Sequence, residues 1–451
     1  MPYEGEFAGY RALQRIAETE RVKNLVRNAR VQAAAVGPRV VPVLAPSPPS
    51  ALPDFVFAID GSLAEIDVRN GFPGAKVGYC TVASVLLDLH RMEELDENRP
   101  ADPREFRKTE EASSIDAALP GSNVVTRTNT SAAESFRQAL YESLHDGVVD
   151  EQEGSPILET YEALLALKPD NRNGQRCPYD DEYACDGRLE RLEKGLTSCA
   201  CDRRKAIYST DALRIHEGFR SLGSNLEAYG EVMQVWERVL LVHLLRCFER
   251  RNWLDRVGRL AFMLDGPLAV FGHPAWLSAA ITKELQRINV KVRQLTGNDL
   301  LILGVEKTGE FVSHFDHIDQ TEQPGEEYFP RRGYQLLTDK YIKERVKFSD
   351  SDKRYGADTY FGRKLFYKTS KGGRIVATIP FLTAEQDTIQ SDDISLYPQF
   401  SAVCALLDKL VSSRFQNALT PLVAANAQAA IPLELGAKVL QQLARALMKE
   451  R

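Results

Sequence analysis

The sequence predicts an α/β protein in which a mixed β-sheet is flanked by helices, with a large insertion and helical extensions at both ends. Strand-like runs end in Asp-Gly at two distant places, FAIDGS (57–62) and FMLDGPL (262–268). A strongly apolar helical run lies between them, and alternating helical and strand patterns follow. A hydrophobic content of 43% and a charged content of 27% over 451 residues are ordinary for a folded, water-soluble chain.

The first 53 residues are predicted as an extension outside the sheet. Apolar residues recur at helical spacing over 8–35, and the following stretch, 37–53, holds six prolines in seventeen residues, which excludes helix there. The N-terminus lacks the apolar run of a signal peptide, and no stretch of about 18 apolar residues predicts a membrane span. We therefore expect a cytoplasmic protein that does not enter the membrane.

Residues 54–94 are predicted to begin the sheet. Three strand-like runs, 55–60, 63–68 and 75–89, are separated by short turns at Gly-Ser and at NGFPG, a pattern typical of an antiparallel meander. Residues 95–224 are polar, broken by Pro and Gly, and contain short helical pieces. We interpret 95–224 as an insertion on the core.

Residues 225–451 are predicted to complete the core. A long helix (225–250) precedes the strand LAFMLDG, a helix around 274–288 and the strand LLILGVEKTG (300–309). A basic helical segment, DKYIKERVKF, precedes two strands joined by SKGG, and helical patterns fill 398–450. Antiparallel strands followed by a helix and a further strand are the element order of a ribonuclease H-like core, in which acidic residues on the first strand, the helix and the fourth strand bind metal ions.

Asp60 and Asp265 stand at two of those places, and geometry selects Glu237 for the third. On a helical wheel Glu237 falls within the apolar stripe of the 225–250 helix, whereas Glu227, Glu231 and Glu249 fall on the opposite side. A carboxylate aimed into an apolar core is costly unless it is paired or bound to metal. Pairing with an Arg remains an alternative for Glu237, and an ordinary turn remains one for each Asp-Gly.

FAIDGS, FMLDGPL and LLILGVEKTG together resemble the NurA nuclease family, over about 55–90 and 225–410. The resemblance implies a divalent-metal-dependent deoxyribonuclease with a ribonuclease H-like core, in which Asp60, Glu237 and Asp265 hold Mn²⁺ or Mg²⁺ and Lys307 contacts the phosphate. It implies DNA-end processing with a HerA-type hexameric translocase ATPase, in DNA repair or anti-phage defence, and a homodimer. Since no Walker GxxxxGK[ST] motif occurs, the chain does not supply its own motor.

One departure from the family pattern concerns a histidine. Family members carry an Ala-His shortly after a Tyr-Pro, whereas here Tyr397 and Pro398 are followed by no His and the region holds Cys404. His273, His314 or His317 is an alternative ligand. The departure also favours a second hypothesis, a catalytically weak or inactive adaptor that binds DNA within an ATPase complex.

Two further features point to ligands. Four cysteines cluster in the insertion, at Cys177, Cys185, Cys199 and Cys201, and suggest a structural Zn²⁺, although the spacing is not that of paired CxxC knuckles and free or redox-active thiols remain alternatives. The segment 331–374 carries 13 Lys or Arg against 5 Asp or Glu and predicts a DNA-binding face. Its candidate DNA contacts are Arg331, Arg332, Lys340, Lys343, Lys347, Arg363 and Lys364.

Overall fold

We describe the protein from a computed structural model. The described residues are 11–29, 41–69, 74–94, 110–149, 154–169, 174–179, 185, 188–189, 192, 194–199, 205–321, 326–387, 390–411, 419–430 and 442. All structural statements below refer to these residues.

A nine-stranded mixed sheet forms the centre of the molecule, in the order β1-β11-β12-β13-β10-β9-β2-β3-β4. The central strands β2, β9 and β10 run parallel to one another, and every other neighbouring pair is antiparallel. The strands are β1 (Val43–Leu44), β2 (Phe55–Arg69), β3 (Ala75–Asp88), β4 (Glu110–Pro120), β9 (Leu260–Asp265), β10 (Leu301–Glu306), β11 (Gly333–Leu336), β12 (Gly362–Lys368) and β13 (Arg374–Pro380).

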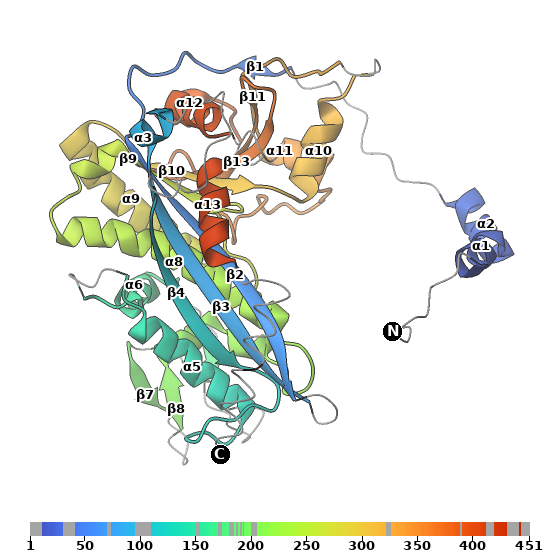
Figure 1. Ribbon diagram of the computed structural model, residues 1–451, viewed down its shortest axis with the longest axis vertical. Helices are drawn as coiled ribbons and strands as arrows, with labels where there is room; N and C mark the ends of the chain where they lie inside the picture. Colours follow the sequence, from blue (N-terminus) through green and yellow to red (C-terminus); the bar gives the residue numbers. More distant parts are fainter. Residues whose placement is uncertain are drawn as a thin grey trace.

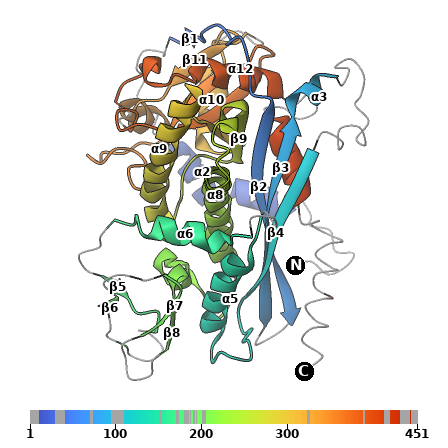
Figure 2. The same cartoon turned by 90° about the vertical axis from the view of Figure 1, so that its left-hand side faces the viewer.

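Helices cover both faces of this sheet, which confirms the predicted layered α/β architecture (Figures 1 and 2). One face packs against α5 (Ala132–Asp146), α6 (Ile157–Leu165), α8 (Leu226–Arg250) and α9 (Leu277–Thr296). The other packs against α12 (Phe400–Leu410) and α13 (Thr420–Ala429). Further helices are α1 (Arg11–Glu18), α2 (Glu20–Asn28), α3 (Leu89–Glu94), α10 (Glu310–Ile318) and α11 (Asp339–Tyr341), the last continuing as a π-helical turn, Ile342–Val346.

The predicted turn at Gly61-Ser62 is wrong, because β2 runs without interruption through both residues. Gly61 pairs with Val82 and Ser62 with Thr81 on β3, so two predicted strands are one long strand. The glycine serves packing instead. A Cβ on Gly61 would lie 2.7 Å from Glu237 Oε1 and 2.7 Å from Met233 Cγ, so glycine lets α8 approach the strand closely.

The insertion predicted at 95–224 contributes a strand to the main sheet. β4 pairs with β3 over eleven residues, from Val77↔Pro120 to Leu87↔Glu110. Its sequence, EEASSIDAALP, is half polar because the strand lies at the sheet edge, which concealed it from a search for apolar runs. Four short strands also lie in this region: β5 (Gln175–Arg176), β6 (Arg188–Leu189), β7 (Leu196–Ser198) and β8 (Ala206–Tyr208).

The remaining elements agree with the sequence pattern, with local differences. The hairpin β12–β13, the long helix α8 and the strands β9 and β10 are confirmed. The N-terminal helical pattern forms two helices divided at Thr19, and α2 buries none of its residues. At the C-terminal end, α12 and α13 are described, and the predicted helix beyond residue 430 lies outside the described residues except at 442.

Candidate active site

Three charged side chains meet where the parallel strands β9 and β10 end; the third parallel strand, β2, continues past this point. Register places Leu264 of β9 beside Ile59 of β2, and Asp265 beside Val305 of β10. Asp60 and Asp265 therefore lie on neighbouring strands, and Lys307 directly follows β10. The Lys307 ammonium lies 3.1 Å from Asp265 Oδ2 and 3.8 Å from Asp60 Oδ2. We call Asp60 and Asp265 the carboxylate pair.

Asp60 is held in an unusual electrostatic environment. The residue is 2% exposed, its Oδ1 accepts a 2.8 Å hydrogen bond from the Gly61 amide, and Oδ2 has no hydrogen-bond partner among the described residues. Burial and the negative charge of Asp265 raise the pKa of Asp60 to about 6, against the opposing effects of Lys307, Asn426 and the Gly61 amide. A buried oxygen whose nearest cation, Lys307, stays beyond hydrogen-bond distance suits a ligand that the protein itself does not provide.

The carboxylate pair lies on the sheet face covered by α12 and α13. Side chains alternate along a strand, and Ala58 and Met263, two residues before Asp60 and Asp265, pack in the core beneath those helices. Asn426 of α13 acts on Asp60 from this side, where it lowers the pKa of that carboxyl group. The C-terminal helices α12 and α13 therefore cover the sheet face on which the pair lies.

Glu237 lies on the opposite face, with the strand between it and Asp60. Position 61 of β2 faces α8, because a Cβ on Gly61 would lie 2.7 Å from Glu237 Oε1, and the neighbouring Asp60 therefore faces the other way. Glu237 is 4% exposed and forms an ion pair with Arg238, which is the alternative that the sequence left open. Among the residues that the structure describes, no hydrogen bond or ion pair joins Glu237 to Asp60 or Asp265.

Arg238 donates hydrogen bonds to the backbone of the loop that follows β9. Its Nε donates to the Ala269 carbonyl at 3.2 Å, and Nη2 donates to the carbonyls of Pro267 at 3.2 Å and Asp265 at 3.4 Å. Burial lowers the pKa of Arg238 to about 10, which still leaves the guanidinium charged at neutral pH. Arg238 thus fixes the turn that follows Asp265, and its positive charge also neutralises Glu237.

The donor set of the carboxylate pair fits a hard divalent ion, whereas Glu237 does not join it in this geometry. Carboxylate oxygens suit Mg²⁺ and Mn²⁺. Within the described part of the chain, the three carboxylates do not bring ligand oxygens within 4.8 Å of one another. Asp60 and Asp265 are therefore the residues that would hold such an ion, together with donors from the substrate or solvent.

The predicted DNA-binding residues divide into exposed and buried groups. The side chains of Lys340 and Lys347 are 80% and 58% exposed, and Arg331 is also exposed. Arg332 and Lys343 are partly buried in ion pairs, with Asp408 at 3.5 Å and Asp339 at 2.8 Å.

Arg363 and Lys364 require a correction, because their exposed fractions are 1% and 3%. Lys364 forms an ion pair with Glu306 and lies 4.1 Å from the ring centroid of Phe311, and Arg363 donates to the Leu337 carbonyl at 3.2 Å. Both point into the core from β12, so neither offers a surface to DNA.

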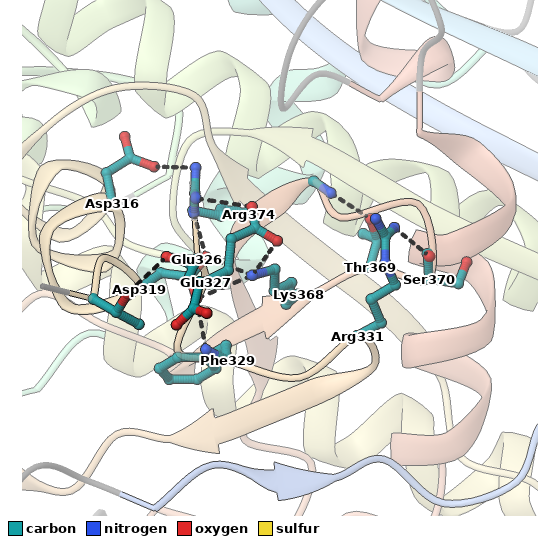
Figure 3. Close-up of polar contacts among 12 residues, drawn as sticks. Asp316, Asp319, Glu326, Glu327, Phe329, Arg331, Lys368, Thr369, Ser370 and Arg374 are labelled. Atoms are coloured by element: carbon teal, nitrogen blue, oxygen red, sulfur yellow. Dashed lines mark hydrogen bonds and ion pairs between the residues drawn. The ribbon is translucent and has the colours of Figure 1, made fainter. Parts of the chain in front are cut away.

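Other cations of the same segment are also engaged internally (Figure 3). Lys368 is fully buried, with its ammonium 2.7 Å from Asp319 and 2.8 Å from Glu327. Arg374 adds a 2.6 Å ion pair to Asp319 and a 3.2 Å contact to Glu327. This network ties the end of α10 to the β12–β13 hairpin, so part of the local positive charge stabilises the fold.

Three of the four clustered cysteines come together. Cys177 and Cys199 have sulfurs 3.3 Å apart, Cys185 and Cys199 have sulfurs 3.5 Å apart, and all three sulfurs lie within 4.8 Å of one another. Cys201 lies outside the described residues.

Comparison with known proteins identifies the family. A protein-family model, the NurA domain, matches residues 55–413, which is most of the chain. The chain belongs to the NurA family. The match includes the carboxylate pair, Glu237, Lys307 and the clustered cysteines, whereas Asn426 of α13 lies beyond it.

Two solved NurA structures are similar to the chain at low identity. One is the NurA nuclease from Sulfolobus solfataricus, with 10% identity, a TM-score of 0.36, and coverage of 98% of this chain and 99% of that one. The other is described as NurA, with 11% identity, a TM-score of 0.30, and 98% coverage of both chains. Comparison with curated proteins gave no match. No helix in the described ranges is both long and apolar enough to cross a bilayer.

The histidines offered as replacements for the NurA family's ligand are engaged elsewhere. His273 pairs with Glu231 at 3.1 Å, and His314 shares a 2.8 Å hydrogen bond with the Tyr341 hydroxyl. His317 is exposed on α10, and Cys404, a residue of α12, is fully buried in the core. In the parts of the NurA chain described here, no hydrogen bond or ion pair joins any of these residues to Asp60 or Asp265.

Sequence reasoning missed two residues at this NurA site. Arg238 carried a signal, since a cation within a strongly apolar helix next to a buried Glu indicates a pair. Asn426 carried none, because nothing in the sequence indicates that a residue 366 positions after Asp60 lies over it.

Proposed function

We propose that this NurA-family protein is a divalent-metal-dependent deoxyribonuclease. The carboxylate pair is the observation that carries the proposal. A buried Asp60 and a partly exposed Asp265 lie on adjacent parallel strands, one oxygen of Asp60 makes no hydrogen bond among the described residues, and a lysine ammonium bridges the pair. Asp265 stands at the carboxyl end of β9 and Lys307 follows that of β10, the edge at which ligands and catalytic groups of open α/β sheets gather.

The strand order supports a ribonuclease H-like core for this enzyme. Within the order β4-β3-β2-β9-β10, the strands β2, β3 and β4 follow one another along the chain and pair antiparallel. On the other side of β2, the strands β9 and β10 run parallel to it. Asp60 lies within the first of these strands and Asp265 ends the fourth. These are the places where such cores carry their acidic residues.

Each residue has a distinct task in the proposed hydrolysis. A divalent ion supplies the activation of water and the stabilisation of the departing oxygen. Asp60 and Asp265 hold the ion, and the Gly61 amide fixes the orientation of the Asp60 carboxylate. Lys307 exchanges its carboxylate contacts for the phosphate, to which an ammonium binds as a point charge.

The proposed DNA surface consists of the exposed cations Arg331, Lys340 and Lys347. Exposed Lys and Arg bind phosphates without regard to sequence and release counterions, so affinity falls as salt rises. Lys340 and Lys347 lie on and just beyond α11, beside α10, which begins three residues after Lys307. DNA held there would lead toward the carboxylate pair.

The partners we propose are DNA, a second copy of the chain and a HerA-type hexameric translocase ATPase. This part of the proposal rests on the family resemblance. The sequence has no phosphate-binding loop, so a translocase that carries DNA to this nuclease would be a separate protein. Processing of DNA ends, in repair or anti-phage defence, is the corresponding role.

A cleavage assay on linear and circular DNA tests the proposal. We expect cleavage with Mn²⁺ or Mg²⁺, none in EDTA, and higher activity with the ATPase. Asp60→Asn should abolish cleavage, whereas Asp67→Asn, an exposed carboxylate on the same strand, should leave it unchanged. Cleavage that persists in EDTA would refute the metal-dependent mechanism.

The role of Glu237 needs a separate measurement, because its placement opposes the sequence-based assignment. If the observed geometry holds during the reaction, Glu237→Gln weakens folding through Arg238 and leaves Mn²⁺ affinity unchanged. A Mn²⁺ affinity that falls sharply in Glu237→Gln, measured by titration of the folded protein, would show that Glu237 turns toward the ion.

A second candidate function is the non-catalytic adaptor, favoured by the absent histidine and by the separation of Glu237 from the carboxylate pair. It predicts DNA and ATPase binding without cleavage under every metal condition. Asp60→Asn would then change neither binding activity. The same set of assays separates the two functions.

A further inference from the structure

A unit separate from the carboxylate pair gathers three thiols. Two short hairpins build it: β5 and β6, which pair Arg176 with Arg188, and β7 and β8, which pair Thr197 with Ile207. Cys177 directly follows β5, and Cys199 directly follows β7. We call this region, with Cys185 between β5 and β6, the cysteine unit.

The positions of the three sulfurs match the requirements of a tetrahedral metal site. Distances of 3.3 Å and 3.5 Å from Cys199 Sγ to the other two sulfurs are far longer than a disulfide bond. Thiolates bound to one Zn²⁺ at about 2.3 Å each lie about 3.8 Å apart. All three cysteines are buried, with exposed fractions of 2%, 6% and 3%.

Among its described residues, the cysteine unit has only a small apolar core of its own. Its separate core consists of the three cysteines with Tyr179 and Ile207, and Leu189 and Leu192 pack against it. Its strands are two or three residues long, shorter than isolated hairpins need for stability. Small folds of this kind are usually stabilised by disulfides or by a metal.

Contacts with α5 anchor the unit to the main fold. Arg137 of α5 is buried in an ion pair with Asp211, donates to the Ala206 carbonyl at 3.0 Å, and lies 4.6 Å from the ring centroid of Tyr179. Lys205 reaches back to Glu134 at 2.7 Å. These contacts hold the hairpins against α5. The three thiols lie where the two hairpins meet, so a metal bound by them would also hold the hairpins to each other.

We propose that Cys177, Cys185 and Cys199 bind one structural Zn²⁺ that joins the two hairpins to each other. Thiolate sulfur selects Zn²⁺ over the hard ions that suit the carboxylate pair. The three described thiols carry the proposal, and Cys201 remains a candidate from the sequence. The zinc site does not depend on the proposed nuclease activity.

The first test measures zinc in the full-length chain, purified without chelators from zinc-replete medium. We expect about one Zn²⁺ per chain, as for structural sites of this affinity. Cobalt reconstitution should give the charge-transfer and visible bands of a tetrahedral thiolate site. Zinc well below stoichiometry together with no cobalt spectrum would overturn the proposal, as would a disulfide linking two of the three cysteines in freshly alkylated protein.

Matched variants assign the ligands. Cys199→Ser should lose most of the zinc and the cobalt spectrum, whereas Cys247→Ser, a buried single cysteine on α8, should keep both. Asp60→Asn should also retain zinc, which separates this site from the carboxylate pair. If Cys199→Ser does not fold, the stoichiometry and the cobalt spectrum of the unaltered chain still decide the outcome. Full zinc retention in a folded Cys199→Ser would contradict the proposal.

Discussion

In the carboxylate pair, a cation of the protein lies between the acidic groups, whereas in the cysteine unit the thiols contact one another directly. Lys307 bridges Asp60 and Asp265, and Cys199 lies within 3.5 Å of both other sulfurs. A carboxylate that is ionised within a fold needs a counter-charge, while thiols are neutral until a metal displaces their protons. A metal must therefore compete with lysine at the first site and with protons at the second.

The two regions also differ in how the chain assembles them. The carboxylate pair joins strands about 200 residues apart, and the register of the main sheet places them together. The thiols come from hairpins within 23 residues of chain, from Cys177 to Cys199. The first site depends on the whole fold, and the second on local structure. We expect changes at one region to leave the other intact.

The largest expected effect tests that independence. Asp60→Asn should lower DNA cleavage by at least about 10³-fold, because it removes a ligand of the catalytic ion. Its zinc content and melting temperature should stay close to those of the unaltered chain. A folded Cys199→Ser should show the reverse pattern, with zinc lost and cleavage reduced only a few-fold. Loss of cleavage in both variants would show that the regions are coupled.

The next prediction concerns the second cation near the pair. Arg238→Met leaves the buried Glu237 without a counter-charge. It also removes the hydrogen-bond donor to the carbonyls of Asp265 and Pro267. We expect the free energy of unfolding to fall by about 3 kcal/mol or more, measured by urea denaturation. Adding Glu237→Gln should restore part of the loss, since the unpaired charge is then gone. A loss below about 1 kcal/mol would contradict a buried pair of this kind.

Lys307 provides an intermediate effect. Lys307→Met should lower the cleavage rate by about 10- to 100-fold if the ammonium contacts the phosphate in the transition state. Because Lys307 lowers the pKa of Asp60, its removal should also move the onset of activity to higher pH. Lys307→Arg should recover part of the rate. A variant with full activity and an unchanged pH profile would assign Lys307 a structural role only.

The smallest effect is a pH dependence of stability in the metal-free protein. The folded-state pKa of Asp60 is about 6, above its ordinary value of 3.8, so the folded state binds more protons than the unfolded state between these values. The contribution of protonated Asp60 to the free energy of unfolding is therefore complete below about pH 4 and is lost as the pH rises through about 6. We expect a decrease of at most about 3 kcal/mol relative to Asp60→Asn, which lacks the titration, because each pKa unit corresponds to about 1.4 kcal/mol.

Unfolding of both proteins in urea at several pH values, in EDTA, measures this difference. Mn²⁺ should remove the decrease, because it binds the ionised carboxylate. Parallel curves for the two proteins in EDTA would show that Asp60 has an ordinary pKa. EDTA acts on any zinc of the cysteine unit in both proteins alike, so that unit should contribute equally to both curves.

The sequence by itself determined the elements whose pattern is local. The apolar stripe of α8, the hairpin of β12 and β13 and the strands that end at Asp265 and Glu306 follow from residue periodicity and turn chemistry. The two Asp-Gly motifs identified Asp60 and Asp265, and their order along the chain predicted that they meet. The proximity of the cysteines was also readable from their clustering.

Only the tertiary structure decided what lies opposite each of these features. The helical wheel gave the buried position of Glu237, but it contains no information on which face of the sheet α8 covers, so it did not reveal that Gly61 and the strand separate Glu237 from Asp60. Charge counting could not distinguish exposed Lys340 from buried Lys364, because burial depends on strand pairing and on partners such as Glu306. Local patterns specify backbone conformation, whereas contacts between segments depend on how the sheet and its helices pack.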